Sequence, residues 1–423
     1  MANGDVITRL LLPRIDEALR DTRAVVLQGA RQVGKSTLAE QIASTRTSLV
    51  VTLDDEDVRR FATNDPAGFV AQFPDGLLVI DEVQRAPQLI VALKAAVDRD
   101  KRPGRFLVTG SMNLLDLAAS HESLAGRAQP LTLYSLSQAE LETRSGSFID
   151  LAFSGHQALD HVSSLTRGDY LERACRGGYP EALARPRARR REEWHDTYLT
   201  QIVNRDAHDI SALQRLADLP RLLRFIAARS GGGMVWSSLA SDAGIPRTTL
   251  DPYIRLLETL FLIHTLPAWT ANLTSREVKQ PKIFLLDTGL AASLLGVTAG
   301  ALGPTRSNSP AGGLLEGLVV GELRRQLGWS EQRARIYHYR DQRGAEVDVV
   351  LEAPDGRVIG IEVKAATTVQ SRDLIGLKLL RDSLADRFVG GYVLHTGPTA
   401  RTVADRVTAL PIDALWNVQP ANP

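Results

Sequence analysis

The fold of this chain is decided by one stretch near its start, Ala24-Val25-Val26-Leu27-Gln28-Gly29-Ala30-Arg31-Gln32-Val33-Gly34-Lys35-Ser36-Thr37-Leu38-Ala39. Its apolar beginning is typical of a buried strand, and a helical pattern starts at Ser36. Between them lies Gly-x-x-x-x-Gly-Lys-Ser, a spacing that lets loop N–H groups and a helix N-terminus point at a phosphate group. The alternative is a strand-to-helix turn that matches by chance, and the intact Lys-Ser pair between strand and helix argues against it.

Each residue type in this loop suits phosphate binding for a chemical reason. Gly29 and Gly34 permit backbone angles that other residues avoid. Lys35 is expected to reach the β- and γ-phosphates of ATP, and the Ser36 hydroxyl to ligate Mg²⁺. The predicted nucleotide-binding residues are therefore Gly29, Ala30, Gln32, Val33, Gly34, Lys35, Ser36 and Thr37.

A second apolar strand pattern ends in two carboxylates, Asp81 and Glu82. Parallel sheets bind their ligands at the carboxyl ends of their strands, so this pair is expected beside the phosphate loop. Asp81 is predicted to hold Mg²⁺ through water, and Glu82 to polarise the water that attacks the γ-phosphate. The earlier acidic cluster at 54–57 is interpreted as a helix cap rather than a metal site.

A third strand pattern, at 105–109, is followed by further polar residues. Thr109, Ser111 and Asn113 all qualify to sense the γ-phosphate, and Ser111 is chosen as the catalytic candidate. Arg127 follows a glycine and has the chemistry of an arginine finger that would complete the site of a neighbouring subunit. The alternative for Arg127 is a surface or helix-capping role.

These motifs together resemble the AAA+ ATPases of bacteria and archaea that are fused to a C-terminal domain of unknown function. The resemblance extends beyond the ATPase, because three later stretches are similar to that second domain: Arg176–Glu181, Tyr198–Asp206 and Phe284–Leu290. It implies a P-loop ATPase and does not imply a known biological role.

The composition limits which other classes of protein this chain could belong to. A chain of 423 residues has enough material for two or three domains, and a formal net charge of +1 gives no global signature for nucleic-acid binding. The single cysteine, Cys175, excludes an intrachain disulfide and fits a reducing compartment. Because no apolar run approaches the length of a membrane span, we predict a cytoplasmic protein with no membrane contact.

The middle of the chain carries two candidate DNA-contacting segments. Residues 219–268 read as helix, tight turn at Gly244, helix and strand, the pattern of a winged helix-turn-helix, which would offer Arg247, Thr248, Thr249 and Arg255 to a groove. The alternative is a packing or partner-binding module. Five arginines lie within 185–191, and a solvated helix face is favoured there over phosphate contact.

A second chemical constellation follows residue 311. Asp348 and Glu362-x-Lys364 lie on two strand patterns joined by a turn, and Glu316 lies on a preceding helix. This arrangement resembles the PD-(D/E)xK nuclease core, in which carboxylates bind Mg²⁺ and the lysine positions water and stabilises the transition state. Asp348, Glu362 and Glu316 are the predicted metal ligands and Lys364 the catalytic residue. The alternative is a hairpin whose charged groups form a buried ion network.

The sequence thus predicts an α/β protein: a P-loop AAA+ parallel-sheet domain in residues 1–142, a helical and winged helix-turn-helix domain in 143–300, and a restriction-endonuclease-like α/β domain in 301–423. The predicted function is Mg²⁺-dependent ATP hydrolysis acting on nucleic acid, DNA rather than RNA, through the nuclease-like domain. The alternative is an ATP-gated protein- or DNA-binding switch without cleavage. A protein partner and further copies of the chain are the other expected partners.

Overall fold

The computed structural model describes residues 7–112, 124, 126–203, 207, 216–270, 280–303, 309–341 and 344–417. The chain divides into two compact units, residues 1–136 with 257–261 and residues 137–256 with 262–423. Apart from residues 257–261, the predicted middle and C-terminal domains fall within the second unit, and their division at residue 300 stays a prediction. Of the motif residues quoted above, Asn113 and residues 204–206 lie outside the described residues.

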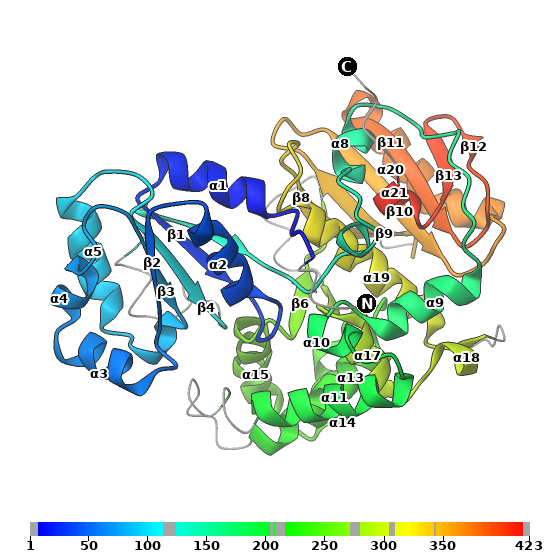
Figure 1. The fold of residues 1–423 in the computed structure, drawn as a ribbon. Helices are drawn as coiled ribbons and strands as arrows, with labels where there is room; N and C mark the ends of the chain where they lie inside the picture. Colours follow the sequence, from blue (N-terminus) through cyan, green and yellow to red (C-terminus); the bar gives the residue numbers. More distant parts are fainter. Residues whose placement is uncertain are drawn as a thin grey trace. The chain divides into compact units, whose positions relative to one another are not determined.

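The first unit is built on a parallel sheet with the strand order β2-β3-β4-β1-β5. Its strands are β1 (Ala24–Gln28), β2 (Ser48–Thr52), β3 (Leu77–Asp81), β4 (Phe106–Gly110) and β5 (Ala128–Thr132). The apolar runs of β1 and β4 are buried throughout, as strands covered on both faces require. Because β4 lies between β1 and β3, the polar ends of these three strands meet at one edge (Figure 1).

Helices connect strands of this sheet as a parallel topology demands, and one further helix precedes the first strand. They are α1 (Leu12–Asp21), α2 (Lys35–Ser44), α3 (Glu56–Asn64), α4 (Pro66–Ala71) and α5 (Leu89–Arg99). Asp55 caps α3, because its carboxylate accepts the backbone N–H groups of Asp57 and Val58 at 2.9 and 3.2 Å. The predicted capping role of the acidic cluster is thereby confirmed.

The second unit begins with the predicted helical region. Its helices are α7 (Gln138–Leu141), α8 (Phe148–Phe153), α9 (Arg167–Arg176), α10 (Pro180–Leu183), α11 (Ala188–Gln201), α13 (Leu219–Ala228), α14 (Trp236–Ala243), α15 (Arg247–Thr259), α17 (Thr288–Leu295) and α18 (Ala299–Leu302). Gly244 ends α14 in the left-handed conformation, at the predicted tight turn. The strands β6 (Ile263–Leu266) and β7 (Lys282–Leu285) pair antiparallel.

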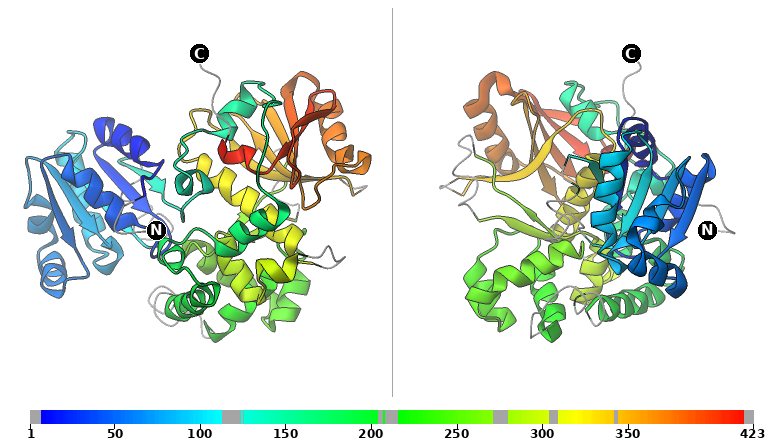
Figure 2. Two further views of the ribbon diagram at one scale, coloured as in Figure 1. Left: turned by 45° about the vertical axis from the view of Figure 1, so that its right-hand side comes forward. Right: turned by 90° about the vertical axis from the view of Figure 1, so that its left-hand side faces the viewer.

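The C-terminal part of the second unit is a mixed sheet with the order β12-β13-β11-β10-β9-β8. Its elements are α19 (Ala311–Gln326), β8 (Arg335–Arg340), β9 (Glu346–Glu352), β10 (Val358–Lys364), α20 (Ile375–Leu384), β11 (Phe388–His395), β12 (Arg401–Ala404), β13 (Val407–Pro411) and α21 (Ala414–Asn417). The first three strands run antiparallel to one another, and β11 pairs parallel with β10. Helix α19 runs between this sheet and the helical part of the unit (Figure 2).

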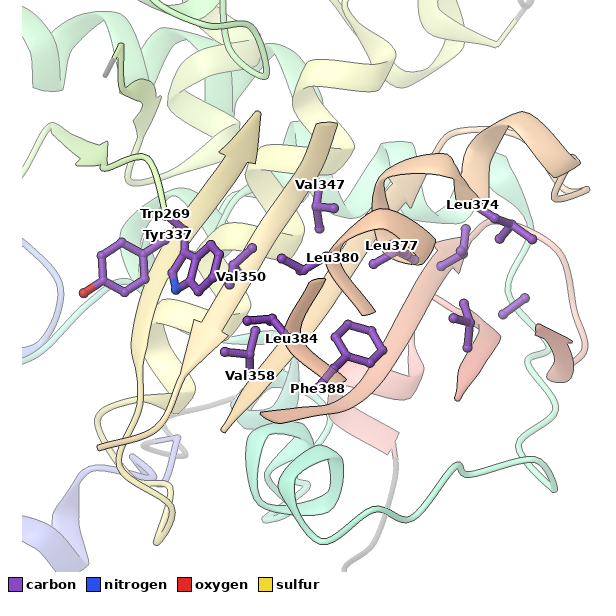
Figure 3. Close-up of a cluster of buried hydrophobic side chains, with 13 residues drawn as sticks. Trp269, Tyr337, Val347, Val350, Val358, Leu374, Leu377, Leu380, Leu384 and Phe388 are labelled. Carbon is purple, nitrogen blue, oxygen red and sulfur yellow. The ribbon is translucent and has the colours of Figure 1, made fainter. Parts of the chain in front are cut away.

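One face of the mixed sheet is closed by α20. Leu377, Leu380 and Leu384 of this helix lie against Val358 and Phe388 of the sheet in a cluster of buried side chains (Figure 3). Burial of each such side chain contributes roughly 1.5–3 kcal/mol to folding. The sheet therefore has a sealed apolar face under α20, and α19 packs against β10.

Candidate nucleotide site and a buried carboxylate cluster

The phosphate loop follows β1 and leads into α2. Gly29 has φ +154°, and a Cβ there would lie 2.1 Å from the backbone oxygen of Leu133, so no side chain fits. Arg9 fastens the loop, because its guanidinium donates to the carbonyl oxygens of Val33 at 2.7 Å and Tyr134 at 2.6 Å. Arg9 belongs to no predicted motif, because it precedes α1 and lies far in sequence from the phosphate loop.

Lys35 is buried at the first position of α2. Its ammonium donates to the carbonyl oxygens of Gly29 and Ala30 at 3.0 and 2.9 Å. These bonds keep the positive charge over the loop in which phosphate binding is predicted. The other predicted nucleotide-binding residues, Gln32, Val33, Gly34, Ser36 and Thr37, lie in the same turn and the first turn of α2.

The two predicted magnesium ligands of the first unit are neighbours. The Ser36 hydroxyl lies 2.9 and 3.1 Å from the two carboxylate oxygens of Asp81, which ends β3. Thr109 of β4 donates its hydroxyl to Asp81 Oδ1 at 2.5 Å. A hydroxyl and a carboxylate at this spacing are oxygen ligands of the kind that Mg²⁺ prefers, and they sit beside the phosphate loop.

Glu82 is held in the left-handed conformation just after β3, with φ 60°. Its N–H donates to the Thr109 hydroxyl at 3.1 Å, and its carboxylate accepts the Ser111 hydroxyl at 3.1 Å. Gln84 donates its amide to Glu82 and also to Ser111, the latter at 2.9 Å. The predicted pair Glu82 and Ser111 is therefore brought into direct contact, and Gln84 is a third member that the sequence analysis missed.

Arg127, the predicted finger, lies immediately before β5. Its guanidinium pairs with the Asp98 carboxylate at 2.6 Å, with about a third of the Arg127 side chain exposed. The hydrogen bond from Arg127 lowers the pKa of Asp98 below its usual value. Within the described first unit Arg127 thus has a surface ion pair, and its finger role stays a prediction.

The predicted carboxylates of the second unit also converge. Ile361 of β10 pairs with Val349 of β9, so the next residues along, Glu362 and Asp348, lie side by side. The N–H of Val363 donates to Asp348 Oδ2 at 2.9 Å, and Lys364 donates to Glu362 Oε1 at 2.7 Å. The predicted pairing of these two strands is confirmed.

A residue outside every predicted motif occupies the centre of this cluster. Lys282, at the start of β7, is completely buried, and its Nζ lies 2.8 Å from Glu316 Oε1, 2.9 Å from Asp348 Oδ1 and 2.9 Å from Glu346 Oε1. The four residues are called the Lys282 cluster below. The only sequence signal was a lone lysine at the edge of an apolar strand. Within the described ranges, no group of three or more His, Cys, Asp or Glu residues is arranged to hold a metal ion.

The electrostatics of the Lys282 cluster follow from burial. Burial raises the pKa of Glu316 well above its usual value, and the charge of Asp348 adds to the effect. Burial and Asp348 likewise raise the pKa of Glu362 to about 8. Burial alone would lower the pKa of Lys282, but Asp348, Glu316 and Glu346 outweigh it and raise that pKa above its usual range. One ammonium thus balances several carboxylates inside the unit.

The two basic candidate segments of the middle region are paired with acids. Arg189 and Arg190 of α11 both bind Glu193, and Arg191 binds Glu172 at 3.0 Å. This pattern favours the solvated helix face that the sequence analysis preferred. On α15, Arg247 pairs with Asp251 at 2.8 Å. Across the described residues, every helix falls short of the length and hydrophobicity that a bilayer crossing requires.

Comparisons with known proteins agree with this geometry. Residues 21–142 match an AAA domain. This range contains the phosphate loop, Asp81, Glu82 and Ser111, so the first unit carries an AAA-type P-loop ATPase domain, which supports ATP binding and hydrolysis. Residues 167–301 and 311–415 match two domains of unknown function, DUF8612 and DUF4143 respectively.

Relatives extend over nearly the whole chain. The uncharacterized proteins Rv2008c of Mycobacterium tuberculosis and Mb2031c of Mycobacterium bovis are each 29% identical over 422 residues, covering 97% of this chain and 86% of theirs. Among solved structures, the Walker-type ATPase PABY2304 of Pyrococcus abyssi is similar with 14% identity and a TM-score of 0.39, covering 69% of this chain and 96% of that one. A RuvB variant of Thermotoga maritima has 20% identity and a TM-score of 0.27, covering 60% and 86%.

Proposed function

We propose that this chain is a Mg²⁺-dependent ATP hydrolase whose ATP cycle controls DNA binding by the second unit, without DNA cleavage. The contact between Ser36 and Asp81, 2.9 Å apart beside the phosphate loop, carries the magnesium part of this proposal. Ser36 would ligate the ion directly and Asp81 would hold it through water. The bound ion would neutralise charge that develops on the transferred phosphate group.

The chain's own residues divide the remaining work. Lys35 would turn its ammonium from the loop carbonyls to the β- and γ-phosphates. Glu82 would orient the attacking water, and Ser111 would hold the Glu82 carboxylate at the end of β4. Gln84 joins these two side chains, so the position of the water-activating group depends on a network and not on Glu82 alone.

The test is steady-state ATP turnover with and without Mg²⁺. We expect Lys35→Ala to weaken ATP binding and turnover together, and Glu82→Gln to reduce turnover by about 10²–10⁴-fold while ATP still binds. Lys94→Ala, a lysine on helix α5 outside the predicted nucleotide-binding and catalytic residues, is the matched control and should behave as wild type. Turnover that survives both substitutions, or that needs no divalent ion, would overturn the proposal.

The DNA-binding part rests on the arrangement of α13, α14, α15, β6 and β7. The first residues of α15 are exposed, and Arg247, Thr248, Thr249 and Arg255 are among the side chains at the surface. Helix, turn, helix and two antiparallel strands in this order support a winged helix. The test is fluorescence anisotropy with duplex DNA: Arg255→Ala should weaken binding and reduce its salt dependence by about one unit of slope. An unchanged affinity and salt slope in Arg255→Ala would speak for a protein-binding module instead.

Metal-dependent cleavage is the second candidate, and one observation favours it. Helix α19, the antiparallel strands β8 to β10, α20 and β11 follow one another with Asp348, Glu362 and Lys364 side by side, as the resemblance to the nuclease core requires. The burial of the carboxylates and the ammonium of Lys282 among them oppose it, because a substrate phosphate needs both access and a metal.

Plasmid and single-strand cleavage with Mg²⁺ or Mn²⁺ decides between these candidates. We expect no cutting by the wild-type chain with or without ATP. Cutting that disappears in Asp348→Ala would replace our proposal with an ATPase-nuclease, and Lys35→Ala would then report whether ATP controls it. Cutting that persists in Asp348→Ala would identify a contaminating nuclease.

A further inference from the structure

We propose that the Lys282 ammonium stands in for a divalent cation in the second unit, and thereby keeps metal ions out of a site formed by Glu316, Glu346, Asp348 and Glu362. The inference rests on the geometry of the Lys282 cluster and does not depend on the proposed ATPase cycle or on DNA binding. It also identifies the ligand class that the site would take without the lysine, a hard divalent cation such as Mn²⁺ or Ca²⁺.

The first support is how completely the lysine fills its place. An ammonium has three N–H donors, and three carboxylate oxygens surround Lys282 Nζ at 2.8, 2.9 and 2.9 Å. They come from α19 and from two positions on β9, and the Lys282 side chain is fully buried. All three donors are therefore used by carboxylates that would otherwise be available to a metal ion.

The second support is an oxygen that the lysine does not reach. Glu362 is 7% exposed, and its Oε2 has no hydrogen-bond partner among the described residues, although its Oε1 accepts Lys364. Glu362 lies beside Asp348 across the β9–β10 pair, so both side chains point to the same face of the sheet. A buried carboxylate oxygen without a donor is expected to attract a cation.

Size and charge indicate which cation would fit. Oxygen ligands lie about 2.3–2.6 Å from Ca²⁺ but about 2.0–2.1 Å from Mg²⁺, so oxygens now at 2.8–2.9 Å from Lys282 Nζ need to move less for the larger ion. A divalent ion would also bring two positive charges where the lysine brings one, and would favour the ionised form of the three carboxyl groups. Mn²⁺ and Ca²⁺ are therefore the appropriate probes.

The surroundings make this an ion site and not a substrate site. Gly231, in the loop between α13 and α14, has φ +87°, and a Cβ there would lie 2.5 Å from Glu316 Oε2. The loop backbone thus covers the Glu316 carboxylate closely. A single ion can enter such a space after a side chain is shortened, whereas a nucleic-acid phosphate group requires the loop to move.

The experiment uses the full chain without nucleotide. Mn²⁺ binding is measured by electron paramagnetic resonance for wild type, Lys282→Met and Lys282→Met with Asp348→Asn. We expect Lys282→Met to bind one more Mn²⁺ per chain than wild type, and the double variant to lose that ion. Thermal unfolding should agree, with Mn²⁺ or Ca²⁺ raising the Tm of Lys282→Met by more than that of the wild type. Ser36 and Asp81 are unchanged in all three proteins. Any Mn²⁺ bound in the first unit therefore contributes equally to each and does not affect the differences between them.

Lys282→Arg is the matched control, because it keeps the positive charge and should bind no additional ion. If Lys282→Met folds only when refolded with Mn²⁺, that rescue supports the proposal. If Mn²⁺ neither binds nor rescues Lys282→Met, and Lys282→Gln also gains no ion, the lysine is part of an ion network alone and the proposal is wrong. An equally tight additional Mn²⁺ in wild type, or one that survives Asp348→Asn, would also overturn it.

Discussion

Ser111 and Gln84 share the work of placing the Glu82 carboxylate. The Ser111 hydroxyl donates to Glu82 at 3.1 Å, and the Gln84 amide contacts both residues. Neither side chain is part of the phosphate loop, so their contribution should be felt in the chemical step and not in nucleotide affinity. This separates them from Lys35, whose ammonium is expected to bind the phosphates themselves.

Ser111→Ala should therefore lower kcat for ATP about tenfold and leave KM nearly unchanged. A hydrogen bond to a charged group contributes about 1.5–3 kcal/mol, and about 1.4 kcal/mol corresponds to a factor of ten in rate. Ser44→Ala on α2 is the control, because the Ser44 hydroxyl donates to the backbone oxygen of Gln41 and lies outside the predicted catalytic residues. A rise in KM without a change in kcat would assign Ser111 to nucleotide binding instead.

At the scale of elements, α19 organises the second unit with buried polar side chains. Both oxygens of Glu322 lie near the N–H of Gln138, at 3.1 and 3.0 Å, where α7 begins. Gln326 accepts the N–H of Phe148 at 2.8 Å, where α8 begins, and donates to the Leu415 carbonyl at 2.6 Å. Since the first N–H groups of a helix have no partner within it, α19 supplies the acceptors for two other helices.

Glu322 makes the stability of the second unit depend on pH. Burial raises the pKa of Glu322 to about 7, against an ordinary value of 4.5. The folded form binds the proton more tightly than the unfolded form, so this contribution is complete at low pH and is lost as pH rises from about 4.5 to 7. The free energy of unfolding should fall by at most about 1.4 kcal/mol per pH unit from this group.

Denaturant unfolding of wild type and Glu322→Gln at several pH values measures this contribution. The amide still offers an oxygen to the Gln138 N–H but cannot ionise, so the variant's stability should fall less between pH 5 and 7. The difference between the two curves isolates Glu322 from other groups that titrate in this range. Parallel curves would mean that Glu322 is ionised in the folded chain throughout.

At the scale of the whole molecule, the role of Arg127 bears on whether copies of the chain assemble and complete one another's ATPase sites. Arg127 pairs with Asp98 on the surface of the first unit. To act as an arginine finger, Arg127 would have to break this ion pair. The two roles predict different behaviour for the two residues. If the two residues form only a surface ion pair, substituting either one should change ATP turnover slightly and to the same extent. If Arg127 is a finger, substituting Arg127 alone should reduce turnover strongly.

Arg127→Ala should thus reduce ATP turnover by about 10³-fold while ATP binding is retained, and Asp98→Asn should leave turnover near the wild-type value. The same chains, examined by sedimentation with and without ATP, should show a larger particle with ATP if copies complete one another's sites. Similar turnover in both variants, with a particle that stays monomeric, would remove Arg127 from the site and return it to the ion pair.

The sequence by itself determined the features that depend on neighbouring residues. The phosphate loop, the strand that ends in Asp81 and Glu82, the cap at Asp55 and the pairing of β9 with β10 all follow from local spacing, because strand, turn and helix signals lie within a few residues of the groups that they position. These features were sufficient to predict the AAA-type ATPase domain and to predict that Asp348 and Glu362 are neighbours.

The tertiary structure alone decided which side chains from distant segments of the chain contact one another. Lys282 meets Glu316, Glu346 and Asp348 from separate elements, and nothing within β7 indicates that its lysine is buried. Arg9 reaches the loop before α2 in the same way. Because the charge balance of a buried site is a sum over chain segments far apart in sequence, spacing could locate the carboxylates, whereas only the fold could place the cation among them.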